Sequence, residues 1–320
     1  DLGKPFAAAK DTRVQAVVLV RRAAARKRAR PTRVLRRQEK LADASAAELR
    51  ATAARGWQIY RSDGERRLCA AMEAESVPLS EVCAVGYGLR TGHNARFVAR
   101  RAPKAGEIAL AGGEDVVPFA LRWRAKALRV PTAQLRALAQ RQLGHPRICV
   151  QRIRTNSRVP HARWLEAAPV GPHLVCLDSL STIACADDDL FWAVLALLNS
   201  VALQRYHRLR TTDVNVKPAL LRELPLPRAL LRPGGAALLS ALARSRASEV
   251  SATAPLEPRS PSRDAADLSP ALERAIDAAV YAAFRLPEPA WIESERGFWG
   301  PRFAQEYPRL TQERQTPRVA

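Results

Sequence analysis

The sequence predicts an α+β fold in which a mixed β-sheet region is flanked by helices. Strands are indicated by two segments of alternating apolar and basic residues, 119–130 and 147–154. Helices are indicated by the mostly apolar segment 190–206 and by apolar residues at every fourth position of 272–284. The chain has 320 residues, of which 47% are hydrophobic, so about two domains with real cores are expected.

The N-terminal region begins with strand-like sequence. Residues 13–20 are nearly all apolar with a β-branched bias, which indicates a buried strand. A lone strand is unstable without neighbours, and the chain starts at Asp1, so we expect a fragment whose companion strands lie upstream. The basic segment 21–37 either contacts phosphates or is a solvated linker. A helix is predicted over 42–55, where Ser45 and Glu48 have the spacing of a capping box.

The segment 79–98 has apolar, strand-like ends and a polar centre that contains three glycines. Glycine permits positive φ and close backbone approach. The segment therefore fits either an ordinary hairpin tip or a loop that reads a polar or anionic surface. The side chains in its centre that can donate hydrogen bonds are Arg90, Thr91, His93, Asn94 and Arg96.

The middle of the chain is predicted to be rich in strands. Residues 108–117 read as strand, turn and strand, and 119–130 as one strand with Arg122, Arg124 and Lys126 on a single face. A face with three cations and no anion favours nucleic acid over plain solvent.

More elements follow toward the C-terminus. A helix over 132–143, a strand over 147–154, a polar loop at 155–158 and strands within 174–184 are predicted.

The last third of the chain is predicted to be largely helical. Asp187 to Asp189 open the apolar helix 190–206, since acids are favourable at a helix N-terminus, and Asn199-Ser200 is its candidate break. The other expected features are a short helix and extended exit in 218–227, helices over 236–246 and 272–284, a flexible Ser/Pro-rich insertion at 248–270, and a tail whose aromatic residues pack on the body.

Charge gives the first indication of a partner. The net charge is +21 and the pI is about 11.0, which favours a polyanionic partner, nucleic acid before an acidic membrane surface. Genomic base composition is the alternative source, because arginine greatly outnumbers lysine. Composition does not explain the position of the charge: residues 122–163 contain eleven basic and no acidic residues.

Several other classes of function have no support in the sequence. The five cysteines form no CxxC pair and the five histidines show no metal spacing, so reduced, mostly buried thiols in a cytoplasmic protein are expected. No apolar run is long enough to span a membrane, and no signal peptide is visible. We expect no metal site, no membrane partner and no catalytic cluster in this chain.

Four segments, in order, resemble the TaqI-like target-recognition domain found at the C-terminal end of adenine-specific DNA methyltransferases of restriction-modification systems. The first is 79–98, with Leu-Ser-Glu-Val followed by Gly-Leu-Arg-Thr-Gly-His-Asn-Ala-Arg-Phe-Val. The others are Leu-Leu-Asn-Ser within 195–200, the Leu-Pro-Leu-Pro exit of 220–227, and the helix from 272 to Leu286 with its Ile-Asp and Val-Tyr pairs.

The resemblance implies a domain organisation. Residues 1–22 would be the last strands of an α/β methyltransferase domain, 23–56 a basic linker and helix, 57–230 the recognition domain and 231–320 a small helical segment. The catalytic signature of that family, Asn/Asp-Pro-Pro-aromatic, is missing, since the sequence contains no Pro-Pro dipeptide. The catalytic half, with its S-adenosylmethionine site, would therefore lie upstream, in this chain or an adjacent one. This chain would supply no catalytic or cofactor-binding residue.

The expected partners are thus double-stranded DNA and a methyltransferase catalytic domain. A Type I restriction specificity subunit is the nearest alternative, and a general RNA- or single-strand-binding protein is another. The candidate DNA-contacting residues are Arg90, Thr91, His93, Asn94, Arg96, Arg122, Arg124, Lys126, Arg152, Arg154, Asn156 and Arg158.

Overall fold

The computed structural model describes residues 32–36, 39–44, 62–129, 132–153, 163–211, 215–252 and 271–307. Its strands are β1 (Thr32–Arg36), β2 (Glu39–Ala44), β3 (Ser76–Pro78), β4 (Cys83–Tyr87), β5 (Val98–Ala99), β6 (Ile108–Ala111), β7 (Val116–Val117), β8 (Ala120–Leu121), β9 (Lys126–Leu128), β10 (Arg147–Gln151), β11 (Ala167–Val170), β12 (Val175–Cys176), β13 (Leu180–Cys185) and β14 (Pro225–Pro227). Its α-helices are α2 (Asp63–Ala74), α3 (Asn94–Phe97), α4 (Ala133–Gln140), α5 (Asp188–Asn199), α6 (Val201–Arg210), α7 (Pro218–Arg222), α8 (Ala237–Ala252), α9 (Ala271–Ala283), α10 (Glu288–Trp299) and α11 (Phe303–Glu306).

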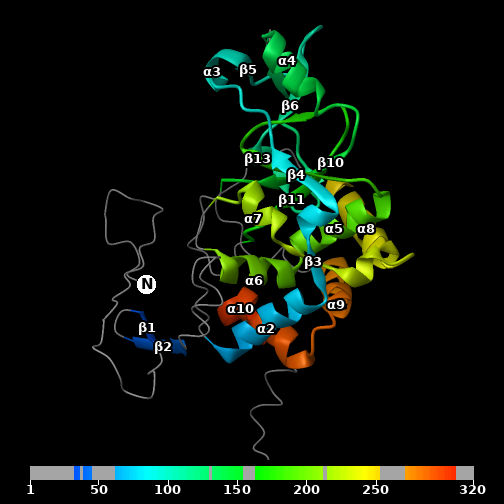
Figure 1. The fold of residues 1–320 in the computed structure, drawn as a ribbon. Coiled ribbons are helices and arrows are strands. Elements are labelled where there is room, and N and C mark those ends of the chain that lie inside the picture. The colour runs from blue at the N-terminus through cyan, green and yellow to red at the C-terminus, as the bar shows by residue number, and fades with distance from the viewer. Residues whose placement is uncertain are drawn as a thin grey trace, which may run out of the picture.

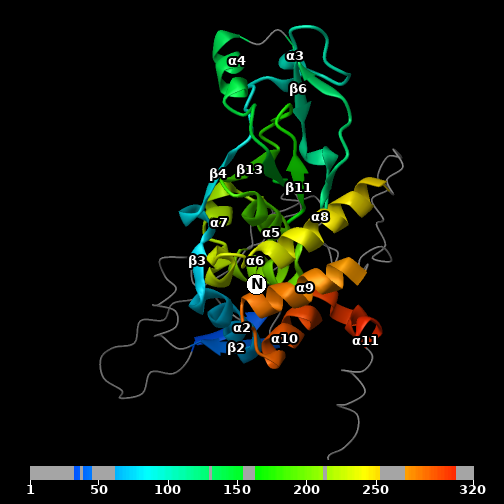
Figure 2. The same cartoon turned by 90° about the vertical axis from the view of Figure 1, so that its right-hand side faces the viewer.

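Two four-stranded sheets organise the described residues. The central sheet has the order β11-β10-β13-β4 and is antiparallel throughout. The second sheet has the order β12-β6-β9-β5, in which β12 runs parallel to β6 and the other neighbours are antiparallel. We call residues 88–145 together with β12 the upper lobe. Figure 1 and Figure 2 both show its elements α3, α4 and β6 at the end of the molecule opposite helices α2 and α10.

Helices α2, α5, α6, α8, α9 and α10 form a helical body that packs against one face of the central sheet. One continuous core joins Leu68 of α2, Ile148 and Ile183 of the sheet, Leu195 of α5 and Val280 of α9, all almost fully buried. The core therefore unites segments from both ends of the described chain. In the described residues, no helix is long and apolar enough to cross a membrane.

Buried amide side chains attach the helices to the sheet. Asn199 and Gln204 hydrogen-bond the backbone of residues 164–167: the Asn199 side chain pairs with both polar groups of Ala167, at 3.2 and 3.0 Å. Gln204 Oε1 accepts from Trp164 N and Leu165 N at 2.7 and 2.9 Å. These amides stand in for a missing neighbouring strand, because a buried sheet edge needs partners for its backbone.

The structure confirms the α+β class and most of the predicted helices. The helix break at Asn199-Ser200 is confirmed, since Ser200 is the N-cap of α6. The exit at β14 is confirmed as well. The tail aromatics pack on the body as expected, because Phe298, Trp299 and Phe303 form a buried cluster with Val201.

Some predicted strands and boundaries differ from the structure. The segment 119–130 is not one strand but the separate strands β8 and β9, so that prediction is wrong. Of the two interpretations of 79–98, the hairpin is excluded, because β4 joins the central sheet while β5 joins the second one. Residues 42–44 belong to β2, and the rest of the helix predicted over 42–55 lies outside the described residues. Helix α8 continues to Ala252, so the predicted insertion cannot begin at 248. The rest of that insertion, 253–270, lies outside the described residues.

Glu295 yields a prediction about pH and stability. Its side chain is completely buried and accepts hydrogen bonds from Tyr281 Oη and, at 2.7 Å, from Trp299 Nε1. Burial raises its pKa above the usual 4.5, although these hydrogen bonds act in the opposite direction. Because the folded protein holds this proton more tightly, the free energy of unfolding should fall as pH rises above about 4.5.

Urea unfolding of Glu295→Gln between pH 4.5 and 8 should show a smaller fall than the wild type, because glutamine cannot ionise. The exposed Glu288→Gln is the matched control and should keep the wild-type slope. Equal slopes for wild type and Glu295→Gln would contradict this assignment.

Candidate nucleic-acid interface

One turn, at residues 177–180, joins three segments that carry candidate site residues. Asp178 N donates to Leu89 O at 3.0 Å, which fixes the start of residues 88–96, called the polar loop from here on. Gly113 N donates to Ser179 Oγ at 2.9 Å, and Arg152 N donates to Ser179 O at 2.9 Å. The turn thereby holds the polar loop, the 112–115 turn and the end of β10 beside one another.

Gly88 is required where the polar loop leaves β4. A Cβ atom at this position would lie 2.0 Å from Leu177 O, so no side chain fits. Gly86 has more room, because a Cβ atom there would lie 3.6 Å from Thr182 Oγ1. These glycines lie in and after a strand rather than in a strand-to-helix turn. They therefore do not have the strand-to-helix arrangement of a dinucleotide- or S-adenosylmethionine-binding turn.

Asp115 fixes the backbone of the segment that carries Arg122 and Arg124. It is fully buried and accepts from Gly112 N at 2.7 Å and from Arg124 N at 3.2 Å. Lys126 Nζ lies 2.8 and 2.7 Å from its two carboxylate oxygens, and 3.1 Å from Glu114. The backbone oxygen of Asp115 accepts from Arg122 N at 2.7 Å. This single residue therefore fixes the segment that carries Arg122 and Arg124.

Lys126 is consequently not on an outward cationic face, contrary to the sequence-based expectation. The chain leaves the extended conformation at Ala125, whose φ is 44°, and this breaks the alternation of the supposed strand. Lys126 then begins β9 facing inward and is 4% exposed. Its charge serves the fold, so we remove it from the exposed cations of the site.

The polar loop is ordered by its own side chains. Thr91 is 7% exposed, and its hydroxyl donates to Asn94 Oδ1 at 2.5 Å. His93 caps α3, because its Nδ1 accepts from Arg96 N at 3.2 Å. Arg90, His93 and Asn94 are all exposed to solvent. Thr91 thus shapes the loop, and its neighbours are the better candidates for contact.

The other candidate DNA-contacting residues differ in how exposed they are. Arg96 and Arg124 are exposed, while Arg122 and Arg152 are half-buried. Arg154, Asn156 and Arg158 lie outside the described residues. The structure adds further exposed cations in the upper lobe, which are Arg100, Lys104, Arg129, Arg136 and Arg141.

The acidic residues of the upper lobe form ion pairs with basic residues of the same lobe. Residues 88–145 contain eleven basic and three acidic residues. Glu107 pairs with Arg101 at 2.6 Å, and this contact lowers the pKa of Glu107 to about 2. Glu114 and Asp115 both pair with Lys126. Within the described part of the chain, seven exposed arginines of this lobe have no ion pair: Arg90, Arg96, Arg100, Arg124, Arg129, Arg136 and Arg141.

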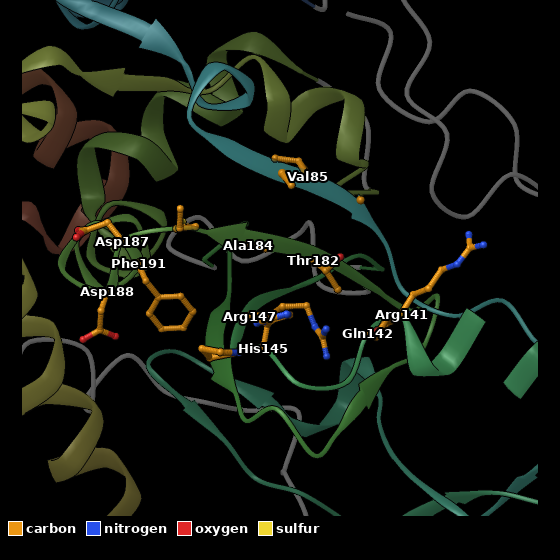
Figure 3. A pocket seen from close by; sticks show the side chains of 15 residues that line it. Val85, Arg141, Gln142, His145, Arg147, Thr182, Ala184, Asp187, Asp188 and Phe191 are labelled. Carbon is orange, nitrogen blue, oxygen red and sulfur yellow. The ribbon is translucent and has the colours of Figure 1, made fainter. Parts of the chain in front are cut away.

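A cleft of about 610 Å³ lies between the upper lobe and the helical body (Figure 3). Arg141, His145 and Arg147 line one side, while Asp187 and Asp188 from the start of α5 line the other. Burial lowers the pKa of Arg147, whose guanidinium donates to Leu174 O at 3.1 Å. Of the predicted DNA-contacting residues that the structure describes, none lines this cleft.

Comparisons with known proteins find likeness of structure only. No protein-family model matches the chain, and no curated protein matches it. The type IIG restriction endonuclease BpuSI superposes with a TM-score of 0.47 and 11% identity, over 83% of this chain and 36% of that one. The HsdS subunit from Thermoanaerobacter tengcongensis superposes with a TM-score of 0.33 and 17% identity, over 75% of this chain and 54% of that one.

This chain therefore spans about a third and about half of the lengths of these two proteins. At these scores the structural likeness gives no evidence about function. The function is therefore inferred from the residues of the chain itself.

The close approach at Gly88 gives a stability prediction. Gly88→Ala should destabilise the fold by at least about 1–3 kcal/mol, because the new methyl would meet a backbone carbonyl that cannot move freely. Gly86→Ala, two residues earlier and within β4, is the matched control and should cost less. Urea unfolding measures both, and equal losses would contradict the proposed packing.

The Asp115–Lys126 pair gives a second prediction. Asp115→Ala should lower the free energy of unfolding by about 3–5 kcal/mol, because it leaves the buried ammonium of Lys126 with only Glu114 as counter-charge. The double variant with Lys126→Met should recover part of that loss. Glu107→Gln, in a more exposed pair, should change stability little. A double variant no more stable than Asp115→Ala would contradict this role of the pair.

Proposed function

We propose that this chain is the DNA-recognition part of a site-specific, adenine-specific DNA methyltransferase of a restriction-modification system. The observation that carries the proposal is the set of seven exposed arginines of the upper lobe, whose acidic residues are all engaged internally. A surface with these unpaired positive charges attracts the negatively charged phosphate backbone of nucleic acid. The family is taken from the sequence resemblance, which covers the segments 79–98, 195–200, 220–227 and 272–286.

Two sets of residues make different kinds of contact with DNA. Arginines such as Arg124, Arg129 and Arg136 neutralise phosphates and set the register of the protein on the duplex. The polar loop, with Arg90, His93 and Asn94, reads base edges, because arginine and amide side chains match the donor and acceptor patterns of the major groove. The internal hydrogen bonds of this loop reduce the entropy lost when it binds.

Methyl transfer belongs to the proposed upstream domain. S-adenosylmethionine bound there would supply the methyl group, and this chain would contribute DNA binding and orientation. A gene segment encoding Asn/Asp-Pro-Pro-aromatic immediately upstream, in frame or adjacent, would support this division of labour.

A Type I specificity subunit remains the second candidate. Its recognition surface would be built from the same residues, and its partner would be a separate methyltransferase subunit rather than an upstream domain. Co-purification with a separately encoded methyltransferase chain, without an in-frame catalytic domain, would favour this second candidate.

Phosphate contact is tested by the salt dependence of binding. Replacing Arg124 and Arg129 together by glutamine should reduce the slope of log K against log salt by about 1.8, since each phosphate contact contributes about 0.9. Arg67→Gln, which removes an exposed arginine from α2, is the matched control and should leave the slope unchanged. Fluorescence anisotropy with a labelled duplex gives the slopes. A parallel loss in the control would indicate a nonspecific charge effect instead.

Base reading is tested by sequence discrimination. A preferred site is first selected from random duplexes with the wild-type protein. His93→Ala with Asn94→Ala should then lower the affinity ratio of preferred to scrambled duplex by about tenfold or more, while scrambled-duplex affinity changes little. Unchanged discrimination would remove the polar loop from the reading surface.

A further inference from the structure

Tyr87 is an aromatic side chain that the fold leaves in solvent. It ends β4, and its side chain is 55% exposed. The other strongly exposed large apolar side chains of the described residues are aliphatic. Cys83 and Val85, which lie on the same face of the strand as Tyr87, are buried against the helical body. The strand therefore extends past the edge of the core and carries an aromatic ring beyond it.

Arg152 covers one face of the Tyr87 ring. Its guanidinium carbon lies 5.1 Å from the ring centroid, within the range of a cation–π contact. The guanidinium also donates to the carbonyl of Asp178, and its backbone nitrogen donates to Ser179 O at 2.9 Å. The arginine is thus held from two sides. One face of the ring is therefore occupied by the guanidinium.

This ring lies beside the proposed DNA-binding loop. Gly88 separates it from Leu89, whose carbonyl accepts from Asp178 N at 3.0 Å, and the exposed Arg90 follows. The turn that orients Arg152 therefore also holds the start of the polar loop. A duplex whose base edges are contacted by Arg90 would lie next to Tyr87.

A flat ring with one occupied face suits one kind of ligand. Bases within an intact duplex are stacked on one another and offer only their edges to a protein. A base that has left the stack offers a π-face, and such faces stack on aromatic side chains. Enzymes that modify bases within a duplex open the target pair.

We propose that Tyr87 stacks on an unpaired base of bound duplex DNA, with Arg152 as the positioning residue that orients the ring. This inference rests on the proposed function, because it requires the chain to bind DNA. It adds a contact for a base that is out of the helix, in addition to the phosphate and base-edge contacts.

The test compares two duplexes that differ by one unpaired base. The full chain is titrated by anisotropy against a matched duplex and against the same duplex with a single-base bulge. The wild type should bind the bulged duplex roughly 10-fold more tightly, since one stacked base contributes on that order. Tyr87→Ala should abolish the difference and Tyr87→Phe should keep it. Ile153→Ala, which truncates a neighbouring side chain that is 51% exposed, is the matched control and should also keep it.

The test of Arg152 measures its effect on base stacking by Tyr87, as distinct from phosphate binding. Arg152→Met should reduce the preference for the bulge while Tyr87 is retained, and Arg152→Lys should restore part of it. A fluorescent 2-aminopurine at the bulge gives an independent readout, because stacking on Tyr87 should quench it in the wild type and in Tyr87→Phe but not in Tyr87→Ala.

The outcomes separate this inference from the proposed function. Absence of a preference in the wild type, or its persistence in Tyr87→Ala, would overturn the inference while salt-dependent duplex binding through the lobe arginines stands. Tighter, Tyr87-dependent binding to a single strand than to the bulged duplex would overturn it in favour of general single-strand binding. Failure to bind any DNA would overturn both.

Discussion

The buried carboxylate of Asp115 is the interaction on which the upper lobe depends. It accepts from two backbone amides and from Lys126, while the backbone oxygen of the same residue accepts from Arg122 N. Separating these partners would leave a buried charge unpaired, which is costly in a low-dielectric interior. The lobe has two other acids in residues 88–145, and both pair with its own cations. Its exposed face is cationic because its anions are used to build it.

Two further constraints connect this lobe to the rest of the described chain. The 177–180 turn holds the polar loop, the 112–115 turn and the end of β10 together. The amides of Asn199 and Gln204 attach the central sheet to the helical body by replacing a strand along the backbone of 164–167. The surface proposed to contact DNA is thus held by hydrogen bonds between segments that are distant in sequence.

The helices could be predicted from the sequence because their apolar periodicity is local. The break at Asn199-Ser200 was also visible, since serine is a favourable N-cap. The strands were harder. The alternation in 119–130 gave no sign that Ala125 reverses it or that Asp115 would draw Lys126 inward. The glycines of 79–98 did indicate a turn, but Leu89 pairs with Leu177, a partner that no local pattern reveals. Tyr87 shares a strand face with the buried Cys83 and Val85, so the alternation gave no signal of its exposure.

The central claim is that the exposed arginines of the upper lobe bind DNA phosphates. The most direct measurement is the slope of log K against log salt for the wild-type chain and a duplex of random sequence. If most of the seven arginines contact phosphates, the slope should approach about −6, at roughly 0.9 per contact. A slope shallower than about −2 would contradict the claim, because so few contacts would leave the cationic face of the lobe without a role in binding.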